Sequence, residues 1–371
     1  MYILQKIVNK FFKQDQQIEN LGKNVYFRLI KAATAGLILN IIFGTSFYFV
    51  ESSVQPDLTY LDSIWWAMVT MTTVGYGDIY AHSFIGRFFI SYPCMLVGIG
   101  IIGYLIGVLA EAMVERMARY RRGDMSIKLS GHIILCNCPS IKKIVNLVKE
   151  IRDSSDFQDK EIVLITETFD EIPEVLSKLN VKFVKGSSAE ENILKKAGFE
   201  KCAGVFVLGK SGDNQDTDVY TLAIASLVDM LKTELNCNPK VIVEVTNQKS
   251  TKLMNHAGVQ GIVESEGITD RLMVQEFLYP GVHDIIQQVI SNSVGSQFYI
   301  FNTKLFGRKL KEIQMAVLQH PEDLQVIGVI NNGKQLINPS KQYEICDGDK
   351  LILLAKSKAD FEGIEKDILN I

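Results

Sequence analysis

The sequence of 371 residues has little excess charge of either sign and few cysteines. Lys and Arg number 39 against 42 Asp and Glu, a net charge of −3, so bulk charge indicates no nucleic-acid partner. The six cysteines lack the spacing of a disulfide framework, which is typical of a reducing cytoplasm. Cys136 and Cys138 stand too close together for a usual zinc pair and end an apolar segment, so we interpret them as core.

Long runs without charge lie in the first third of the chain, at residues 32–50 and 88–110. Each is long enough to cross roughly 30 Å of hydrocarbon as a helix. A shorter uncharged run, residues 63–77, is typical of a re-entrant helix and loop. The first run begins too far into the chain to be a cleaved signal peptide.

Basic residues gather outside the two long runs, whereas the segment between the runs holds Arg87 as its only Lys or Arg. This asymmetry predicts a multi-pass protein of the cell (plasma) membrane with both termini cytoplasmic and the re-entrant loop facing outward. Residues 1–30 are basic and partly amphipathic. They are expected either to lie on the inner leaflet or to form a flexible tail.

The segment 65–78 reads WWAMVTMTTVGYGD and resembles the pore helix and selectivity filter of two-helix potassium channels. The resemblance implies that backbone carbonyls replace the hydration shell of K⁺ in the pore. A closed ring requires four copies of one filter, which predicts a homotetramer in the lipid bilayer. The filter residues are Thr73, Val74, Gly75, Tyr76, Gly77 and Asp78.

Several pore positions carry further expectations. Asp78 is expected to place negative charge at the outer mouth and to bond to Trp66. Val69 stands where the family often has a pore-helix glutamate, which argues against filter inactivation coupled to that carboxylate. By position, Gly98 or Gly100 resembles the family's gating hinge, although glycine also serves close helix packing in membranes. The sequence has no Arg-rich helix of the kind that senses voltage.

From residue 131 onward, apolar strands alternate with helical patterns, which predicts a doubly wound parallel sheet. This part resembles the RCK domain, the regulator of potassium conductance that is related to the TrkA-N module. The markers are the strand beginning at His132, Gly186–Ser187 and the segment 256–259. The resemblance implies a Rossmann-like N-lobe and a small α+β C-lobe. The predicted strands are 132–136, 162–166, 182–184, 204–208, 241–245 and 261–263.

The expected organisation follows these patterns along the chain. The fold class is a membrane α-helical pore of two transmembrane helices and a re-entrant pore helix, followed by the α/β RCK lobes. The expected parts are a cytoplasmic segment 1–30, helices 31–50 and 88–118 flanking pore helix and filter 60–78, a linker 119–130, an N-lobe 131–268, crossover helices 269–293 and a C-lobe 294–371.

A nucleotide is one candidate ligand for the Rossmann-like lobe. The glycine-rich loop GxGxxG that brings backbone close to a pyrophosphate is missing. Asn137 stands where the first glycine is expected, and Pro139 removes a donor. Glu167, after the second strand, remains a candidate for a ribose, with Gly186 nearby in the pattern. NAD or an adenine nucleotide is therefore the less favoured ligand.

Calcium is the favoured candidate ligand. Glu244 matches a carboxylate that binds calcium in archaeal relatives, but Thr246 and Leu208 stand where its companions are expected. Two other acidic groups are candidates, and both also fit helix capping or a solvated surface. They are Asp213, Asp216 and Asp218, and the pair Glu264 and Glu266.

The leading hypothesis is a potassium-selective channel whose homotetrameric pore is gated by ligand binding to a cytoplasmic RCK ring. The ring would hold four modules, or eight if additional RCK copies complete it. A membrane-tethered NAD-dependent enzyme is the second hypothesis, but no catalytic acid or base stands beside a nicotinamide site, so we expect no enzyme. A regulatory subunit of a potassium transporter is the third, and such regulators carry no filter of their own.

Overall fold

The computed structural model describes residues 2–369 except 155, 211–214, 247, 256–257, 266, 294, 322 and 357–360. Side chains are described from residue 25 onward, except also those of residues 215, 216, 248, 249, 253, 361, 362 and 369. The chain divides into two compact units, Met1–Tyr120 and Arg121–Ile371. The first unit is helical and the second contains both sheets.

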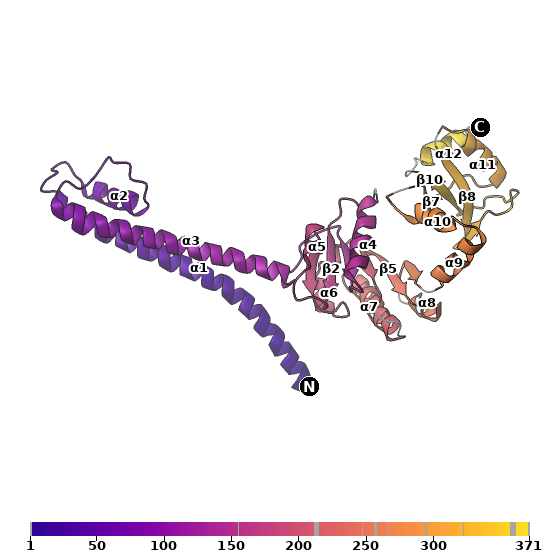
Figure 1. Cartoon of the computed structure of the whole chain (residues 1–371), viewed down its shortest axis with the longest axis horizontal. Coiled ribbons are helices and arrows are strands. Elements are labelled where there is room, and N and C mark those ends of the chain that lie inside the picture. Colours follow the sequence, from indigo (N-terminus) through magenta and orange to yellow (C-terminus); the bar gives the residue numbers. More distant parts are fainter. Residues whose placement is uncertain are drawn as a thin grey trace. The chain divides into compact units, whose positions relative to one another are not determined.

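The first unit contains two long helices and a short one. Helix α1 spans Tyr2–Glu51 and α3 spans Tyr92–Arg121; they lie side by side, with α2 (Tyr60–Met71) near one end (Figure 1). A π-helical turn, η1 (Gly86–Ser91), leads into α3. Segments Val25–Glu51 and Gly86–Arg121 are long and apolar enough to cross a membrane, as predicted. Helix α1 runs unbroken from Tyr2 to Glu51, and this segment contains no proline that would interrupt it.

Apolar side chains join α2 to both long helices. Trp66 is 5% exposed and stacks on Phe47 of α1, with ring centroids 3.7 Å apart and planes 16° apart. Ala67 and Met71 pack in the same cluster with Cys94 of α3. This cluster holds the pore helix between the two long helices and thereby fixes where the loop that follows it begins.

The N-lobe of the second unit is a six-stranded parallel sheet with the strand order β3-β2-β1-β4-β5-β6. Separate apolar cores cover its two faces, so the predicted doubly wound sheet is confirmed. The strand order reverses between β1 and β4. The strands are β1 (Ile133–Cys136), β2 (Ile162–Thr166), β3 (Lys182–Lys185), β4 (Gly204–Val207), β5 (Lys240–Val245) and β6 (Gly261–Glu264).

The helices of the N-lobe connect consecutive strands, as the alternating pattern predicted. Helix α4 begins after Ser140, whose hydroxyl accepts from the Lys143 N–H and caps the helix. The helices are α4 (Ile141–Asp153), α5 (Glu174–Lys178), α6 (Glu191–Lys196), η2 (Phe199–Lys201), α7 (Gln215–Glu234) and α8 (Gln248–Met254).

Two helices, α9 (Ile268–Leu278) and α10 (Val282–Ile290), lead to the C-lobe. The C-lobe is a four-stranded antiparallel sheet, in the order β7-β10-β8-β9, with its own apolar core, which confirms the predicted small α+β lobe. Its elements are β7 (Gln297–Asn302), α11 (Leu310–Gln319), β8 (Leu324–Asn331), β9 (Lys334–Ile337), β10 (Lys350–Ala355) and α12 (Phe361–Leu369).

His132 makes N-lobe stability depend on pH. Its ring is 1% exposed at the start of β1, and its Nε2–H donates to the Ala197 carbonyl at 2.9 Å. Burial lowers the pKa of His132. Above the unfolded pKa of about 6.5 both states are neutral, whereas below it the unfolded chain takes up a proton that the folded lobe resists. Stability is therefore expected to fall as pH drops through this range.

Replacing His132 by glutamine removes the titrating group while keeping a donor for Ala197. We expect the fall in thermal stability from pH 7.5 to 5.5 to be smaller in His132→Gln than in the unmodified protein. His82, on the loop between α2 and α3, provides the matched control, His82→Gln. Equal pH slopes for the unmodified protein and His132→Gln would show that His132 does not carry the effect.

Candidate ion-conduction and ligand sites

The pore helix ends in carbonyl groups that hold the start of the filter. A capping box fixes its other end: the Asp62 N–H donates to the Thr59 hydroxyl at 3.2 Å, and the Thr59 N–H donates to the Asp62 carboxylate at 3.1 Å. At the C-terminal end, the Val69 carbonyl accepts from the N–H groups of Val74 at 3.0 Å and Gly75 at 3.3 Å. The first filter donors are therefore satisfied by the helix.

Along the filter, the backbone alternates between the left-handed region, with positive φ, and conformations outside it. Thr73, Gly75 and Gly77 lie in the left-handed region, with φ of 61°, 56° and 77°, and the intervening Val74 and Tyr76 do not. Alternating hand turns successive peptide groups to the same side of the chain. A β-branched residue at positive φ is strained, and such strain concentrates at functional sites.

The glycines of the filter are required by backbone conformation rather than by crowding. A Cβ added at Gly75 or Gly77 would meet nothing within 4 Å in the single chain. The side chains of Val74 and Tyr76 are 54% and 67% exposed. Much of these two side chains is therefore exposed within one chain.

Trp65, and not Trp66, holds the outer end of the filter. The indole Nε1–H of Trp65 donates to the Asp78 carboxylate at 3.1 Å, and its ring stacks parallel to that of Tyr76, with centroids 5.9 Å apart. The expected bond to Trp66 is wrong, because that ring faces Phe47 in the core. Adjacent helical residues point about 100° apart, so only one of the two indoles can reach Asp78.

Val69 is 6% exposed, and its side chain brings no charge behind the filter. The anchoring carboxylate lies elsewhere, at Glu51, the last residue of α1. Glu51 is fully buried and accepts from the N–H groups of His82 at 2.9 Å and Ser83 at 3.0 Å, from the Ser83 hydroxyl and from the Gln55 amide. These bonds tie the loop that leaves the filter to the end of the first helix.

The sequence did not single out Glu51 as an anchoring residue. A buried carboxylate is stable only with donors that satisfy it, and backbone N–H groups brought near by folding leave no signal in a sequence. Two further hydrogen bonds also hold the loop that follows the filter. The Gln55 amide also donates to the Tyr80 carbonyl at 3.1 Å, and Arg87 Nε donates to the Ala81 carbonyl at 2.8 Å.

The two hinge candidates in α3 differ in their surroundings. A Cβ at Gly98 would lie 2.3 Å from the Met71 carbonyl oxygen and 2.5 Å from its Cα, so glycine there permits α3 to touch the end of the pore helix. A Cβ at Gly100 would meet nothing within 4 Å. Close packing therefore explains Gly98, whereas Gly100 leaves the hinge prediction open.

In the N-lobe, side chains span the carboxyl edge of the sheet where the strand order reverses. Asn137 follows β1 at φ 73°, and its amide donates to the Leu208 carbonyl beyond β4 at 2.8 Å. Asparagine thus adopts the left-handed turn expected of a glycine. Its side chain, however, crosses the crevice in which a dinucleotide's pyrophosphate would approach the backbone.

Glu244, the calcium candidate of β5, has a partner on each oxygen. Its Oε1 pairs with the Lys143 ammonium group of α4, and its Oε2 accepts from the Gly209 N–H at 3.1 Å. Lys143 is a residue that the sequence did not single out. A calcium ion at Glu244 would have to displace Lys143, because a cation repels the ammonium group.

Among the remaining acidic candidates that the structure describes, Asp218 and Glu264 each have partners of their own. Asp218 is 6% exposed and binds the end of β5 to α8, accepting from the Thr246 N–H at 2.8 Å and from the Ser250 hydroxyl. Glu264 accepts from the Thr251 hydroxyl at 2.8 Å. Within the part of the chain that the structure describes, no three His, Cys, Asp or Glu side chains are grouped as metal ligands. Asp213, Glu266 and the side chain of Asp216 lie outside the described residues.

The other two nucleotide candidates lie at the same edge of the sheet. Glu167 is exposed directly after β2, where a ribose-binding carboxylate would stand. Gly186 follows β3 at φ 150°, and a Cβ there would lie 2.6 Å from Ile193 Cδ1. Close approach of α6 therefore accounts for Gly186 without a ligand.

Known proteins resemble this chain along most of its length. Family profiles described as "Ion channel", "Calcium-activated potassium channel slowpoke-like RCK domain" and "Castor and Pollux, part of voltage-gated ion channel" match residues 35–115, 128–242 and 266–368. The calcium-gated potassium channel TvoK of Thermoplasma volcanium is 30% identical over 307 residues, which cover 82% of this chain and 84% of TvoK. The chain belongs to the potassium channels that carry an RCK domain.

A solved gating ring shares its fold with part of this chain. The human SLO3 gating ring superposes with a TM-score of 0.50 at 13% identity, covering 64% of this chain and 46% of that one. The GsuK channel bound to NAD gives a TM-score of 0.46 at 17% identity, covering 90% of this chain and 58% of that one. As a member of this channel family the chain is a membrane protein and not an enzyme. The hypothesis of a membrane-tethered NAD-dependent enzyme is therefore excluded.

Glu51 provides a test of how this channel holds its filter. Glu51→Gln keeps the shape but turns an amide N–H₂ toward backbone donors, leaving buried N–H groups without an acceptor, a loss of about 1–3 kcal/mol. We expect the channel to assemble and K⁺ flux in liposomes to decline severalfold. The matched control is Asp57→Asn, on the exposed loop before α2. If Glu51→Gln and the control variant gave the same K⁺ flux, this anchoring role of Glu51 would be excluded.

Proposed function

We propose that four copies of this chain form a K⁺-selective pore in the cell (plasma) membrane, gated by ligand binding to a cytoplasmic ring of RCK domains. The observation that carries the conduction proposal is the alternating hand of residues 73–77. Rings of carbonyl oxygens facing one axis replace the hydration shell of K⁺, and the outer charge of Asp78 attracts cations. The regulatory domain follows in the same chain.

The orientation proposal rests on charge. Between Glu51 and Gly86, the two ends of the candidate spans, no Lys or Arg occurs, whereas basic residues flank the other ends. The positive-inside rule then places the loop and filter outside and both termini in the cytoplasm.

Assembly of the ring is supported by apolar surface on α9 and α10. Neither helix buries any residue within one chain, and Met273, Phe277 and Ile290 are well exposed. Such a face is expected to pack against another RCK domain. The ring contains four RCK domains if only the pore subunits supply them, or eight if additional copies join. Measuring the mass of the assembled channel would distinguish the two.

Calcium is the proposed gating ligand. The support is the 30% identity to the calcium-gated TvoK over most of both chains. Binding favours one arrangement of the ring only by its difference in affinity between the closed and open arrangements. The ring then acts on α3 through the segment 119–130.

Conduction is tested at Gly77. Alanine at φ 77° suffers the left-handed penalty of about 1–2 kcal/mol in each of four copies, although its Cβ meets no atom of the same chain. We expect Gly77→Ala to abolish K⁺-selective flux in liposomes while the tetramer still assembles. Gly107→Ala, also without a neighbour within 4 Å, is the matched control and is expected to conduct. Selective K⁺ flux through Gly77→Ala would show that the filter is wrongly assigned.

The ligand is tested by thermal shift of the full-length channel with Ca²⁺, Mg²⁺, NAD or ADP. Binding at a hundredfold excess over Kd stabilises the folded state by about 2.7 kcal/mol. We expect a shift with Ca²⁺ that EGTA removes. If Glu244 is a ligand, Glu244→Gln abolishes this shift and Lys143→Gln strengthens it, because the competing ammonium group is gone.

The remaining outcomes separate the alternatives. A Ca²⁺ shift that survives Glu244→Gln places the metal at another site. A shift with NAD or ADP and none with Ca²⁺ contradicts calcium gating and favours a nucleotide near Glu167. Replacement by Glu167→Gln should then weaken the nucleotide shift, because the ribose loses its carboxylate acceptor.

A further inference from the structure

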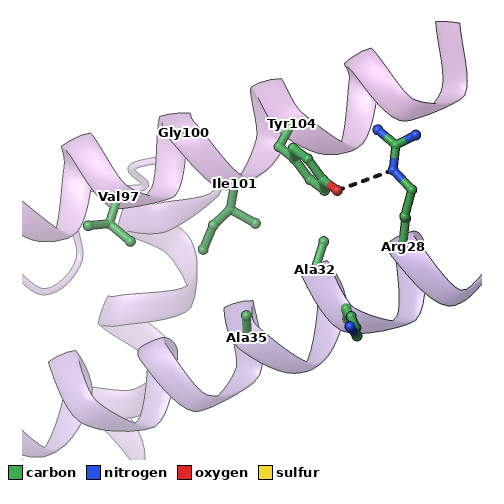
Figure 2. Close-up of a pocket in the computed structure, with 8 residues that line it drawn as sticks. Arg28, Ala32, Ala35, Val97, Gly100, Ile101 and Tyr104 are labelled. Atoms are coloured by element: carbon green, nitrogen blue, oxygen red, sulfur yellow. Dashed lines mark hydrogen bonds between the residues drawn. The ribbon is translucent and has the colours of Figure 1, made fainter. Parts of the chain in front are cut away.

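A hollow of about 540 Å³ lies between α1 and α3 (Figure 2). Ala32 and Ala35 of α1 face Val97 and Ile101 of α3 across it, and Arg28 stands at one end. The hollow belongs to neither the filter nor the RCK domain. Its walls are formed by the two candidate membrane spans, so the medium that reaches it includes lipid.

One end of the hollow is basic. Arg28 and Lys31 line it, and they are the last two charged residues before the uncharged run 32–50. Arg28 reaches across to α3, where its Nη1 pairs with Glu111 at 2.9 Å and its Nε donates to the Tyr104 hydroxyl at 3.4 Å. A guanidinium group carries five N–H donors, so these two contacts do not exhaust it.

The rest of the hollow is apolar and exists because its residues are small. Ala32 and Ala35 present only methyl groups, and a Cβ at Gly100 would meet nothing within 4 Å. From Arg28 to Ala35 the helix rises about 10 Å. That length takes an occupant from the depth of the headgroups into the hydrocarbon.

We propose that this hollow binds an anionic phospholipid of the inner leaflet, with its phosphate at Arg28 and Lys31 and an acyl chain along Ala32, Ala35 and Ile101. The inference rests on the membrane orientation proposed above. Its support is charge complementarity: a basic pocket between membrane helices on the cytoplasmic side matches an anionic headgroup, while the apolar part matches a lipid tail.

The ion pair with Glu111 defines how such a lipid competes. The lipid phosphate and the Glu111 carboxylate are both anionic acceptors for the same guanidinium group. Because both groups are negative, the Glu111 carboxylate repels a lipid phosphate at the remaining donors of Arg28. Removing the Glu111 charge should strengthen lipid binding, whereas removing Arg28 should weaken it.

The test uses the full-length tetramer in detergent, titrated with phosphatidylglycerol or phosphatidylcholine and read by native mass spectrometry. We expect phosphatidylglycerol to bind more tightly. Arg28→Gln should weaken it about fivefold, corresponding to about 1 kcal/mol for one basic residue at an anionic lipid. Glu111→Gln should hold or strengthen it, and Ala35→Leu should weaken both lipids by filling the hollow. Arg116→Gln, an exposed charge on α3 that does not line the hollow, should change neither.

Three outcomes overturn the proposal. Equal effects of Arg28→Gln and Arg116→Gln would mean that general surface charge attracts the lipid. Equal weakening by Arg28→Gln and Glu111→Gln would mean that the ion pair only stabilises the helices. No change in lipid number with any variant, together with dissociation of the Ala35→Leu tetramer, would mean that a neighbouring subunit fills the hollow. The readout is independent of flux, so failure here leaves the conduction proposal standing.

Discussion

Backbone that is neither helix nor closed barrel is tolerated at membrane depth only where it is buried in protein or lines an aqueous path. Residues 72–78 are such backbone, and the pore unit is arranged around them. Val69 satisfies the first N–H groups from below, Trp65 holds Asp78 at the outer end, and Glu51 fixes the returning loop. These contacts hold the two ends of the segment and the loop that follows it.

The regulatory lobe meets a different constraint. Parallel strands end together at one edge of the sheet, and where their order reverses the edge opens into a crevice that commonly holds a ligand. Here the chain spans that crevice with its own side chains, Asn137 to Leu208 and Lys143 to Glu244. A ligand at this place has to compete with contacts that the folded lobe already makes.

The architecture was largely predictable from the sequence, because periodicity and hydrophobic length report directly on helices and strands. The two membrane helices, the six parallel strands and the small C-lobe are as predicted. The resemblance of residues 73–78 to a potassium filter stays a prediction, and the positive φ of Gly75 and Gly77 is compatible with it. The contacts that a side chain makes with distant parts of the fold were harder to predict from the sequence. The bond of Asp78 to Trp65 rather than Trp66, and the burial of Glu51, depend on rotations and loop returns that no local pattern encodes.

The acidic candidates illustrate the same limit. Sequence proximity suggested that Asp218 might join a metal site, yet its carboxylate is used between α7 and the end of β5. Carboxylates are numerous in this chain, and their role depends on which donors surround each one after folding. The role of Lys143 could not be predicted from the sequence, because its partner Glu244 stands 101 residues away in the chain.

The contact of Gly98 with Met71 has a mechanical consequence. It places the backbone of α3 directly against the end of the pore helix, with no side chain between them to absorb movement. Beyond this point Gly100 has free space around it. Helix α3 therefore resembles a lever whose fulcrum lies just beneath the filter. If Gly100 is the hinge, a bend there would move the following part of α3 while Gly98 keeps its contact with Met71.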